Sequence, residues 1–422
     1  MAKKSYIVFV FYPQRNKKVS YKWRAFKKRP PFLILLKNFC IIYLTMVKPN
    51  PYVYSSKDFY NLFDKEIKWQ IVGKEIITKD KVAEILKNLK QPNVKILGKS
   101  IEEKILSIFL DENIRFGDKN LILDKKDYWI DKITYFTTKK LPVRLAILGF
   151  PFKMPVKLKT VRTLPDMGEL LSLARLLFIA NLIKKIYKPG AEVIIFTEES
   201  FHKFIGVDRK NALAYIYELK KWLKFLRWNS IIKLKSLSLM EKLPDFEKIF
   251  NKKLRENKKL LKENDPEFLK KFNEAFIPIF RIVNSLSFEE KTLMDVYNDQ
   301  IKDEDLSKKA LKIRNLLRKK ATLALLNYFA YLQTRDELNF IEKAAPHALL
   351  LTVSPKYYRL PIYPVSKEIE VLPYHGVPIY FQKNNKWQID YLINLKRKTW
   401  KLVEVYLYKD KDKTPFFYKV VG

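Results

Sequence analysis

Cysteine, histidine and glycine are scarce in this chain of 422 residues. Cys40 is the only cysteine, which excludes an internal disulfide framework and a cysteine-ligated metal site. The histidines, His202, His347 and His375, are far apart in sequence, and no two have the close spacing of a typical zinc site. With 9 glycines, and with neither a Walker A nor a GxGxxG pattern, the chain is not expected to form a glycine-rich phosphate loop.

Acidic residues are outnumbered, because 83 Lys and Arg stand against 45 Asp and Glu and give a formal net charge of +38. Such a charge indicates either an anionic partner, nucleic acid or a phosphorylated small molecule, or a lysine-rich composition without a specific partner. Lysine is spread over every segment and forms no confined basic block beyond the N-terminus, which favours the second interpretation. Hydrophobic residues make up 48%, enough for a sizeable core.

The N-terminus is basic and then apolar. Residues 1–31 contain no acid, and the apolar run Phe32–Met46 that follows is interrupted by Lys37 and Asn38. It is shorter than the roughly 20 apolar residues that a membrane span needs. We expect residues 1–45 to be a dispensable extension of a cytoplasmic protein without stable membrane insertion, with a membrane-associating arm as the alternative.

The clearest secondary-structure pattern lies in residues 141–240. Apolar runs predict strands that alternate with two apolar or amphipathic helices, the second of them capped by Asp208; the strands are Arg144–Phe152, Ala191–Thr197 and Ser230–Leu237, and the helices are Met167–Tyr187 and Asp208–Leu226. This alternation predicts βαβ units. We therefore expect an α/β fold with a Rossmann-like, mostly parallel sheet flanked by helices.

The flanking regions are assigned more coarsely. We expect a mixed α/β segment at 46–140, a charged helical insertion at 241–335, and C-terminal strands at 336–422 that complete the catalytic domain. The predicted C-terminal strands are residues 347–353, 357–363, 369–373, 376–381 and 402–408.

Lys153 is the first candidate site residue, because it follows an apolar strand in the sequence FPFKMP. Ligands of parallel sheets bind at the carboxyl ends of the strands. There a desolvated lysine could bind a phosphate or sugar oxygen, or react as an amine with a ketone. The alternative is a lysine whose stem covers apolar surface while its ammonium reaches water.

The helix predicted from Met167 provides three more candidates. Asp166 directly precedes it, and Glu169 and Arg175 lie in its first half. Asp166 and Glu169 fit a variant of the capping box, or they could hold a substrate amino group or move a proton. Arg175 is the only charge in Leu170–Ile183, so we expect it to be buried against an acid or an anionic ligand. His375 precedes Gly376 in a turn, and Arg359 lies upstream; a structural role for this histidine is the alternative to a catalytic one.

Several gapped motifs resemble the isocyanide synthase family, the pyoverdine/dityrosine biosynthesis family. They match in one order across about residues 60–385, with GFPFKMPVKLKTVRTLPDMGELLSLARL first, followed by YKPGAEVIIF, FIGV, AYIYEL, YRLPIYP and YHGV. The resemblance implies an enzyme that converts the amino group of an L-amino acid, tyrosine or tryptophan, to an isonitrile. Ribulose 5-phosphate would be the co-substrate that gives the carbon.

The resemblance also implies the site and the partners. Lys153, Asp166, Glu169 and His375 would be catalytic, and Lys159, Arg175 and Arg359 would bind substrate. In this hypothesis Lys153, Lys159 and Arg175 bind the sugar phosphate, Asp166 or Glu169 holds the amino group or acts as the base, and His375 is an acid/base. No metal or nucleotide cofactor and no nucleic acid is expected, and a non-haem iron, 2-oxoglutarate-dependent oxygenase would act on the product.

The chain departs from the family pattern at several polar positions. Met154 and Val156 follow the lysine, FTEES (residues 196–200) replaces a Ser-Asp-Gly-Arg segment, and Tyr363 and Tyr374 replace a histidine and a tryptophan. These changes leave open another amino-acid substrate, an N-formyl product, or a homologue without activity. A basic nucleic-acid-binding protein and a membrane-tethered protein are the rival interpretations.

Overall fold

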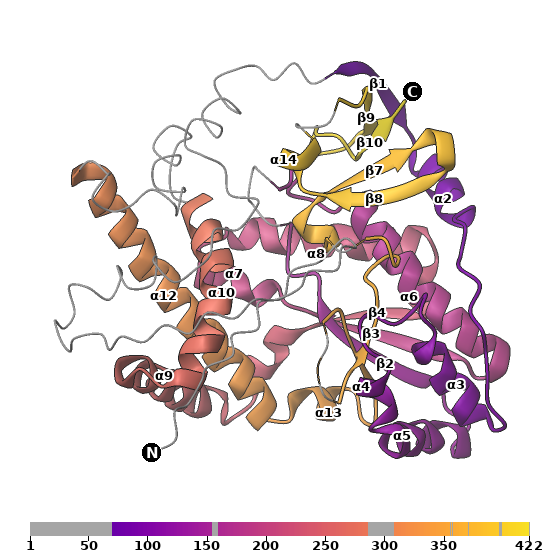
Figure 1. The fold of residues 1–422 in the computed structure, drawn as a ribbon, viewed down its shortest axis with the longest axis horizontal. Coiled ribbons are helices and arrows are strands. Elements are labelled where there is room, and N and C mark those ends of the chain that lie inside the picture. The colour runs from indigo at the N-terminus through magenta and orange to yellow at the C-terminus, as the bar shows by residue number, and fades with distance from the viewer. Residues whose placement is uncertain are drawn as a thin grey trace, which may run out of the picture. The chain divides into compact units, whose positions relative to one another are not determined.

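The computed structural model describes residues 70–153, 159–285, 308–354, 356, 358–369, 371–395 and 399–421. All of them lie in the second of two compact units into which the chain divides, Pro51–Gly422 (Figure 1). The predictions for residues 1–45, and the positions of Met154 and Val156, lie outside the described residues. None of the described helices is both long and apolar enough to cross a bilayer.

A parallel sheet of five strands organises the fold. Its strands, in spatial order, are β4 (Ile232–Ser236), β3 (Ala191–Thr197), β2 (Val143–Gly149), β5 (Leu349–Thr352) and β6 (Leu360–Pro361). Every neighbouring pair runs parallel. β2 and β3 are buried along most of their length, which explains why their sequences are continuous apolar runs without alternation. The predicted α/β fold with a Rossmann-like sheet is confirmed.

Helices connect and cover these strands. α6 (Met167–Ile186) links β2 to β3, and α8 (Arg209–Phe225), capped by Asp208, links β3 to β4 after the short η1 (Glu199–Phe201) and α7 (His202–Ile205). α6 packs on β3, and α5 packs on β2 and β5. The N-terminal described helices are α2 (Lys79–Lys87), α3 (Ile101–Leu110), α4 (Asn120–Leu123) and α5 (Lys126–Thr138).

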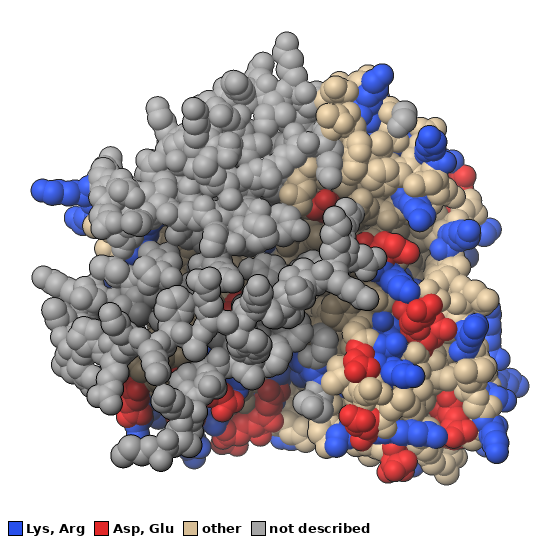
Figure 2. All heavy atoms as spheres, viewed as in Figure 1, with Lys and Arg blue, Asp and Glu red and all other residues tan. Residues whose placement is uncertain are grey.

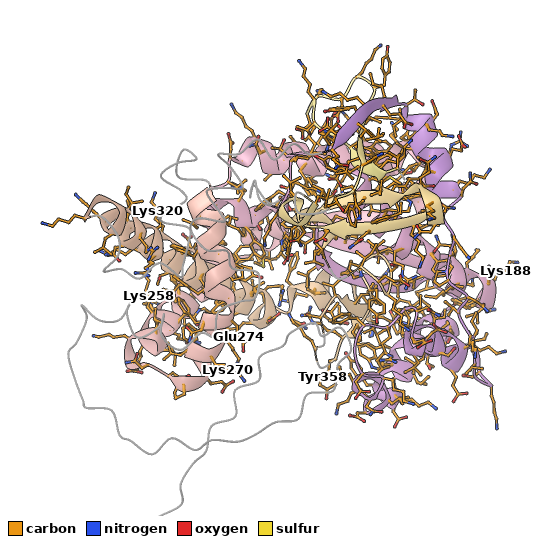
Figure 3. All side chains as sticks on the ribbon, turned by 45° about the horizontal axis from the view of Figure 1, so that its top comes forward. Lys188, Lys258, Lys270, Glu274, Lys320 and Tyr358 are labelled. Carbon is orange, nitrogen blue, oxygen red and sulfur yellow. The ribbon has the colours of Figure 1, made fainter. Side chains whose placement is uncertain are left out.

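A group of long helices precedes β5. It consists of α9 (Phe246–Glu263), α10 (Pro266–Ser285) and α12 (Lys308–Glu337), and the short α13 (Phe340–Ala344) follows. Phe268 and Phe272 of α10 pack with Leu325 and Leu326 of α12 in a small core of their own. Exposed lysines lie on all three long helices, among them Lys258, Lys270 and Lys320 (Figure 3).

A second, mixed sheet is formed mainly by strands from the C-terminal part of the chain (Figure 1). Its strands, in spatial order, are β1 (Ile71–Ile77), β9 (Leu402–Leu407), β10 (Phe417–Val420), β7 (Val377–Phe381) and β8 (Lys386–Asp390). The pairs β1–β9 and β10–β7 are parallel, whereas β9–β10 and β7–β8 are antiparallel. α6 contacts β7 as well as β3, so one helix touches both sheets.

The strand predicted at residues 369–373 is wrong. Val371 and Leu372 are not in a strand, and Pro373 begins a 3-10 helix, η5 (Pro373–His375). Ile369 is buried as a single anchor, 1% exposed, and its amide donates to the carbonyl of Ser366. A proline lacks the N–H that a strand ladder needs, and this one instead occupies the first position of the 3-10 turn.

The parallel sheet has a switch point between β2 and β5. From β2 the chain moves through β3 to β4 on one side, and β5 and β6 are then added on the other side of β2. Crevices form where the strand order reverses, at the carboxyl ends of the two strands that diverge there. The segments that follow β2 and β5 are therefore where a ligand site is expected.

Candidate active site

A small cavity lies at this switch point. Its volume is about 20 Å³, and its lining comes from the end of β2, from α6, from the segments that follow β5 and β6, and from the residues around η5; these residues are Ile147, Leu148, Gly149, Phe150, Ser172, Leu176, Val353, Ile362, Pro364, Leu372, Pro373 and Tyr374. Phe150 has a φ of 53°, in the left-handed region that a bulky residue seldom adopts. Such strained residues concentrate at functional sites, and this one turns the chain from β2 toward Lys153.

Lys153 lies in a buried group of charges. Its Nζ is 2.7 Å from Oδ2 of Asp166 and 3.0 Å from both carboxylate oxygens of Glu169, and it donates to the carbonyl of Pro373 at 2.8 Å. The side chains of Lys153, Asp166 and Glu169 are at most 1% exposed. An ammonium has three protons to donate, and three residues receive them here. The ammonium of Lys153 therefore has protein partners for all its protons. We call Lys153, Asp166 and Glu169 the buried triad.

The start of α6 fixes the two carboxylates. Oδ1 of Asp166 accepts from the amide of Gly168 at 2.8 Å, and Oε2 of Glu169 accepts from the amide of Asp166 at 2.9 Å, which completes a capping box. The hydroxyl of Tyr215, on α8, donates to Oε1 of Glu169 at 3.1 Å. The predicted capping box is present, and the same carboxylates also hold the lysine. Capping and charge pairing are thus two functions of one pair of side chains.

Burial controls the protonation of the triad. Desolvation raises the pKa of Asp166 well above its ordinary value, Lys153 opposes this rise and Glu169 adds to it. A proton on Asp166 brings the net charge of the buried group from −1 toward zero, which removes the cost of an uncompensated buried charge. Burial, with a further contribution from Glu169, also raises the pKa of Tyr215, so its phenol stays protonated and able to donate.

His375 and Lys159 lie beside the triad. Burial, together with the positive charges of Lys159 and Lys153, lowers the pKa of His375 to about 3. Its imidazole is therefore neutral near pH 7. Nζ of Lys159 is 4.8 Å from the ring centroid of Tyr391, and the Lys159 carbonyl accepts from the amide of Leu392 at 3.1 Å.

Arg175 lies about two turns beyond Glu169 along α6, beside the segment around Asn113. It is 3% exposed on α6, its guanidinium donates to the carbonyl of Asn113, and it lies 5.7 Å from the ring centroid of Phe178. Burial lowers its pKa to about 10, and the carboxylates of Asp111 and Glu368 partly oppose this shift. Its predicted burial is confirmed. Its immediate partner is a backbone carbonyl, and the hypothesis that it helps Lys153 to bind a phosphate stays a prediction.

Arg359 belongs to a second charged group. With Lys356 it lies in the connection from β5 to β6, and both interact electrostatically with Arg335 of α12 and with Glu198, which follows β3. Desolvation raises the pKa of Glu198 to about 7 although all three cations oppose the rise. Within the described ranges, no group of three or more His, Cys, Asp and Glu side chains is arranged to hold a metal ion.

Comparison with known proteins identifies the family. Residues 133–385, more than half of the chain, match the profile of the pyoverdine/dityrosine biosynthesis proteins. The chain belongs to this family. A crystal structure of a member, PvcA from Pseudomonas aeruginosa, superposes with a TM-score of 0.55 at 16% identity, over 75% of this chain and 100% of that one. That superposition shows a shared fold.

Curated relatives match over shorter segments. L-tryptophan isonitrile synthase AmbI2 of Fischerella ambigua is 32% identical over 103 residues, which are 24% of this chain and 31% of that protein. L-tyrosine isonitrile synthase of Xenorhabdus nematophila is 29% identical over 129 residues, 29% of this chain and 38% of the relative. Spore wall maturation protein DIT1 of Saccharomyces cerevisiae is 29% identical over 124 residues, 29% of this chain and 22% of the relative. The matches span less than two fifths of these relatives.

Two departures from the family pattern have clear positions. Tyr374 lines the cavity, with its ring centroid 6.3 Å from that of Phe150. Tyr363 follows β6 and packs edge-on against Phe116 at 5.5 Å. One replacement therefore changes the wall of the candidate site, while the other contributes to packing beside β6.

Sequence reasoning missed four charged or polar residues of this site. Glu198 stood directly after a predicted strand, and Tyr215 stood inside the AYIYEL motif, so both carried a signal of position. Lys356 and Arg335 carried none, because one is a lysine in a lysine-rich chain and the other an arginine of an amphipathic helix.

Proposed function

We propose that this family member is an isonitrile synthase-like, carbon–nitrogen bond-forming enzyme. It converts the amino group of an L-amino acid, tyrosine or tryptophan, to an isonitrile, with ribulose 5-phosphate as carbon donor. The observation that carries the proposal is the buried triad, which stands at the switch point of the sheet in a chain that belongs to this family. The names of two relatives, L-tryptophan and L-tyrosine isonitrile synthase, support the substrate class.

The proposed reaction begins with condensation of the amine on the sugar ketone, and proton transfers and fragmentation of the sugar follow. A carboxyl group with a raised pKa suits this chemistry, because it holds a proton at a higher pH than an ordinary carboxyl group does and can give it to the substrate. We assign this role to Asp166. Among the described residues, Lys153 is the partner of its Oδ2, at 2.7 Å, whereas Glu169 accepts from Lys153, Tyr215 and the amide of Asp166.

Lys153 and His375 take supporting roles in this proposal. Lys153 holds the two carboxylates at the strand end, since its ammonium already has three acceptors. A neutral His375 can accept or donate one hydrogen bond to a substrate, but with a pKa of about 3 it is a weak base. No cofactor enters the scheme, and an oxygenase that acts on the isonitrile product is a proposed partner.

The test is product formation by the purified full chain. The protein is incubated with ribulose 5-phosphate, unlabelled or carbon-13-labelled, and with a panel of L-amino acids, and isonitriles are trapped with a tetrazine and weighed by mass spectrometry. We expect a product that gains the mass of one labelled carbon. Asp166→Asn should abolish it, while Asp208→Asn, at the exposed N-cap of α8, should not. An N-formyl product or no product from the folded protein would refute the proposal.

A further inference from the structure

The loop between β9 and β10, residues 408–416, contacts the chain just before α6. Nη1 of Arg162 lies 2.6 Å from Oδ2 of Asp410 and donates to the carbonyl of Thr414 at 2.8 Å. The side chain of Arg162 is 1% exposed, and its guanidinium carbon lies 5.3 Å from the ring centroid of Phe416. A buried guanidinium is costly without an acid and further acceptors, so these contacts join the loop firmly to the chain before α6.

Asp412 of the same loop binds the backbone that follows Arg162. Its Oδ2 accepts from the amides of Thr163 and Leu164 at 2.8 and 2.9 Å. Its Oδ1 accepts from the hydroxyl of Thr414 at 3.0 Å, which holds the carboxylate in place within the loop. Hydrogen bonds to an ionised acceptor are stronger than those between neutral groups. Because the two amides are consecutive, these bonds fix the direction of the chain as well as its position.

The loop also holds the chain on the other side of Asp166. The carbonyl of Phe416 accepts from the amide of Met167 at 3.4 Å. Only two residues, Pro165 and Asp166, separate this amide from those that Asp412 binds. The φ angle of a proline is fixed by its ring. The backbone of Asp166 therefore has little freedom to move while the loop stays in place.

The second sheet supports the same segment further upstream. Val161 packs against a small core of this sheet that contains Leu392 and Val420. The carbonyl of Lys159 accepts from the amide of Leu392 at 3.1 Å. Residues 159–167 are therefore supported by the second sheet along their length.

The loop itself has a tight backbone conformation. Lys409 and Lys413 have φ angles of 56° and 52°, in the left-handed region that lysine seldom adopts. Both lysines are exposed, whereas the acids that follow or precede them, Asp410 and Asp412, turn toward the segment before α6. Such conformations persist where the surrounding contacts determine them, and they concentrate at functional sites.

We propose that Arg162, Asp410 and Asp412 are positioning residues, which keep the carboxyl group of Asp166 in place beside Lys153. They act through the backbone before α6 and not through contact with the substrate. The second sheet is thereby part of the active-site machinery although it supplies no reacting group. The positioning rests on the contacts of the loop, whereas the role of Asp166 as the acid rests on the proposed function.

The kinetics of isonitrile formation by the full chain separate positioning from folding. Asp412→Ala removes the acceptor of both amides and should lower kcat by about 10–100-fold, because a displacement of about 1 Å at a reacting group has effects of this size. KM for either substrate should change by less than about twofold, since no binding contact is lost. Asp412→Asn should restore most of kcat, because the amide oxygen of asparagine can accept from both backbone amides.

Asp265→Ala is the matched control. Asp265 is also partly buried and accepts from a backbone amide, that of Phe268 at 2.8 Å, at the start of α10. This variant should lose a similar contact and keep its kcat. Asp412→Ala leaves the pair of Arg162 and Asp410 intact, and we expect it to fold.

Hydrogen exchange tests the contacts without the reaction. In Asp412→Ala the amides of Thr163 and Leu164 should exchange about tenfold faster or more than in the wild type, which corresponds to the loss of a hydrogen bond to a charged group. They should exchange at nearly the wild-type rate in Asp412→Asn. The coupling free energy between Lys153 and Asp166, from a cycle of Lys153→Met and Asp166→Asn in urea, should fall when Asp412→Ala is present.

The outcomes separate this proposal from the proposed function. Unchanged exchange in Asp412→Ala overturns the positioning role, and so does an unchanged coupling between Lys153 and Asp166. A loss of kcat that Asp265→Ala shares, or that Asp412→Asn fails to restore, also overturns it. A wild type that forms no isonitrile refutes the proposed function alone, and faster exchange with weaker coupling would still support the positioning of Asp166.

Discussion

Replacement of Lys153 by methionine should destabilise the protein strongly and in a pH-dependent way. The ammonium is fully buried between Asp166 and Glu169, at 2.7 and 3.0 Å. Removal of one partner from a buried ion pair costs about 3–5 kcal/mol, because the other charge stays buried without compensation. Burial raises the pKa of Asp166, which eases its protonation when the lysine is removed, and Glu169 keeps Tyr215 and a backbone amide as donors. We therefore expect the free energy of unfolding to fall by an amount at the lower end of this range, about 3 kcal/mol at pH 7.

Urea unfolding at pH 7 and pH 5 measures this loss. The loss of unfolding free energy should be smaller at pH 5, where protons can neutralise the carboxylates that have lost their partner. The double variant Lys153→Met/Glu169→Gln should recover most of the lost free energy at pH 7. Lys132→Met is the control, since Lys132 pairs with Glu342 at 3.3 Å near the surface, and such a pair contributes less than about 1 kcal/mol. A loss for Lys153→Met no larger than in the control would refute the buried-pair reasoning.

The structural role of Lys153 means that its replacement affects both stability and activity. A variant that loses about 3 kcal/mol also loses the geometry of Asp166 and the cap of α6, so missing product would not make the lysine a catalytic group. Asp166→Asn is a sharper probe of the chemistry, because asparagine is also a favourable N-cap residue.

Two further predictions concern neighbouring groups. Tyr215→Phe leaves a buried oxygen of Glu169 with one donor fewer and should lower the free energy of unfolding, measured in urea, by about 1–3 kcal/mol. The control Tyr217→Phe, at a residue that is 61% exposed on the same helix, should leave this free energy almost unchanged. Equal losses in the two variants would contradict the buried contact. Because the folded pKa of Glu198 is raised from 4.5 to about 7, its stabilising contribution is complete below pH 4.5 and is lost as the pH rises through 7. In phosphate-free buffer the wild type should therefore lose about 2–3 kcal/mol relative to Glu198→Gln between pH 4.5 and 8, and parallel stability curves would count against the shift.

The sequence predicted the central βαβ units well, because their signals are local. Ala191–Thr197 is a strand with the predicted bounds, and α6 begins at the predicted Met167. Continuous apolar runs and capping residues determine such elements without help from distant parts of the chain. β8 and β10 were missed, because KWQID and FYKV are short and partly polar and become strands only by pairing with β7 and β9.

The sequence predicted which residues form the candidate site, but it could not predict the contacts between them. Lys153 and Glu169 were found from a strand end and a cap, but the Pro373 carbonyl that completes the lysine's shell is 220 residues away in sequence. The grouping of Arg175 with Lys153 as phosphate ligands stays a prediction. At about 100° per residue, six positions along a helix from Glu169 turn a side chain by about 240°, toward the segment around Asn113.

The net charge illustrates why burial informs function better than composition does. On the coloured part of Figure 2, basic and acidic side chains alternate, so the charge of +38 gathers into no broad basic surface there. Exposed lysines are solvated and screened by salt, so they have little effect on stability and do not indicate a particular partner. Arg335 and Arg359 are different, because they are withdrawn from water and lie beside a carboxylate that itself favours its protonated form up to about pH 7. The cost of withdrawing a charge from water therefore distinguishes these few side chains from the many exposed lysines.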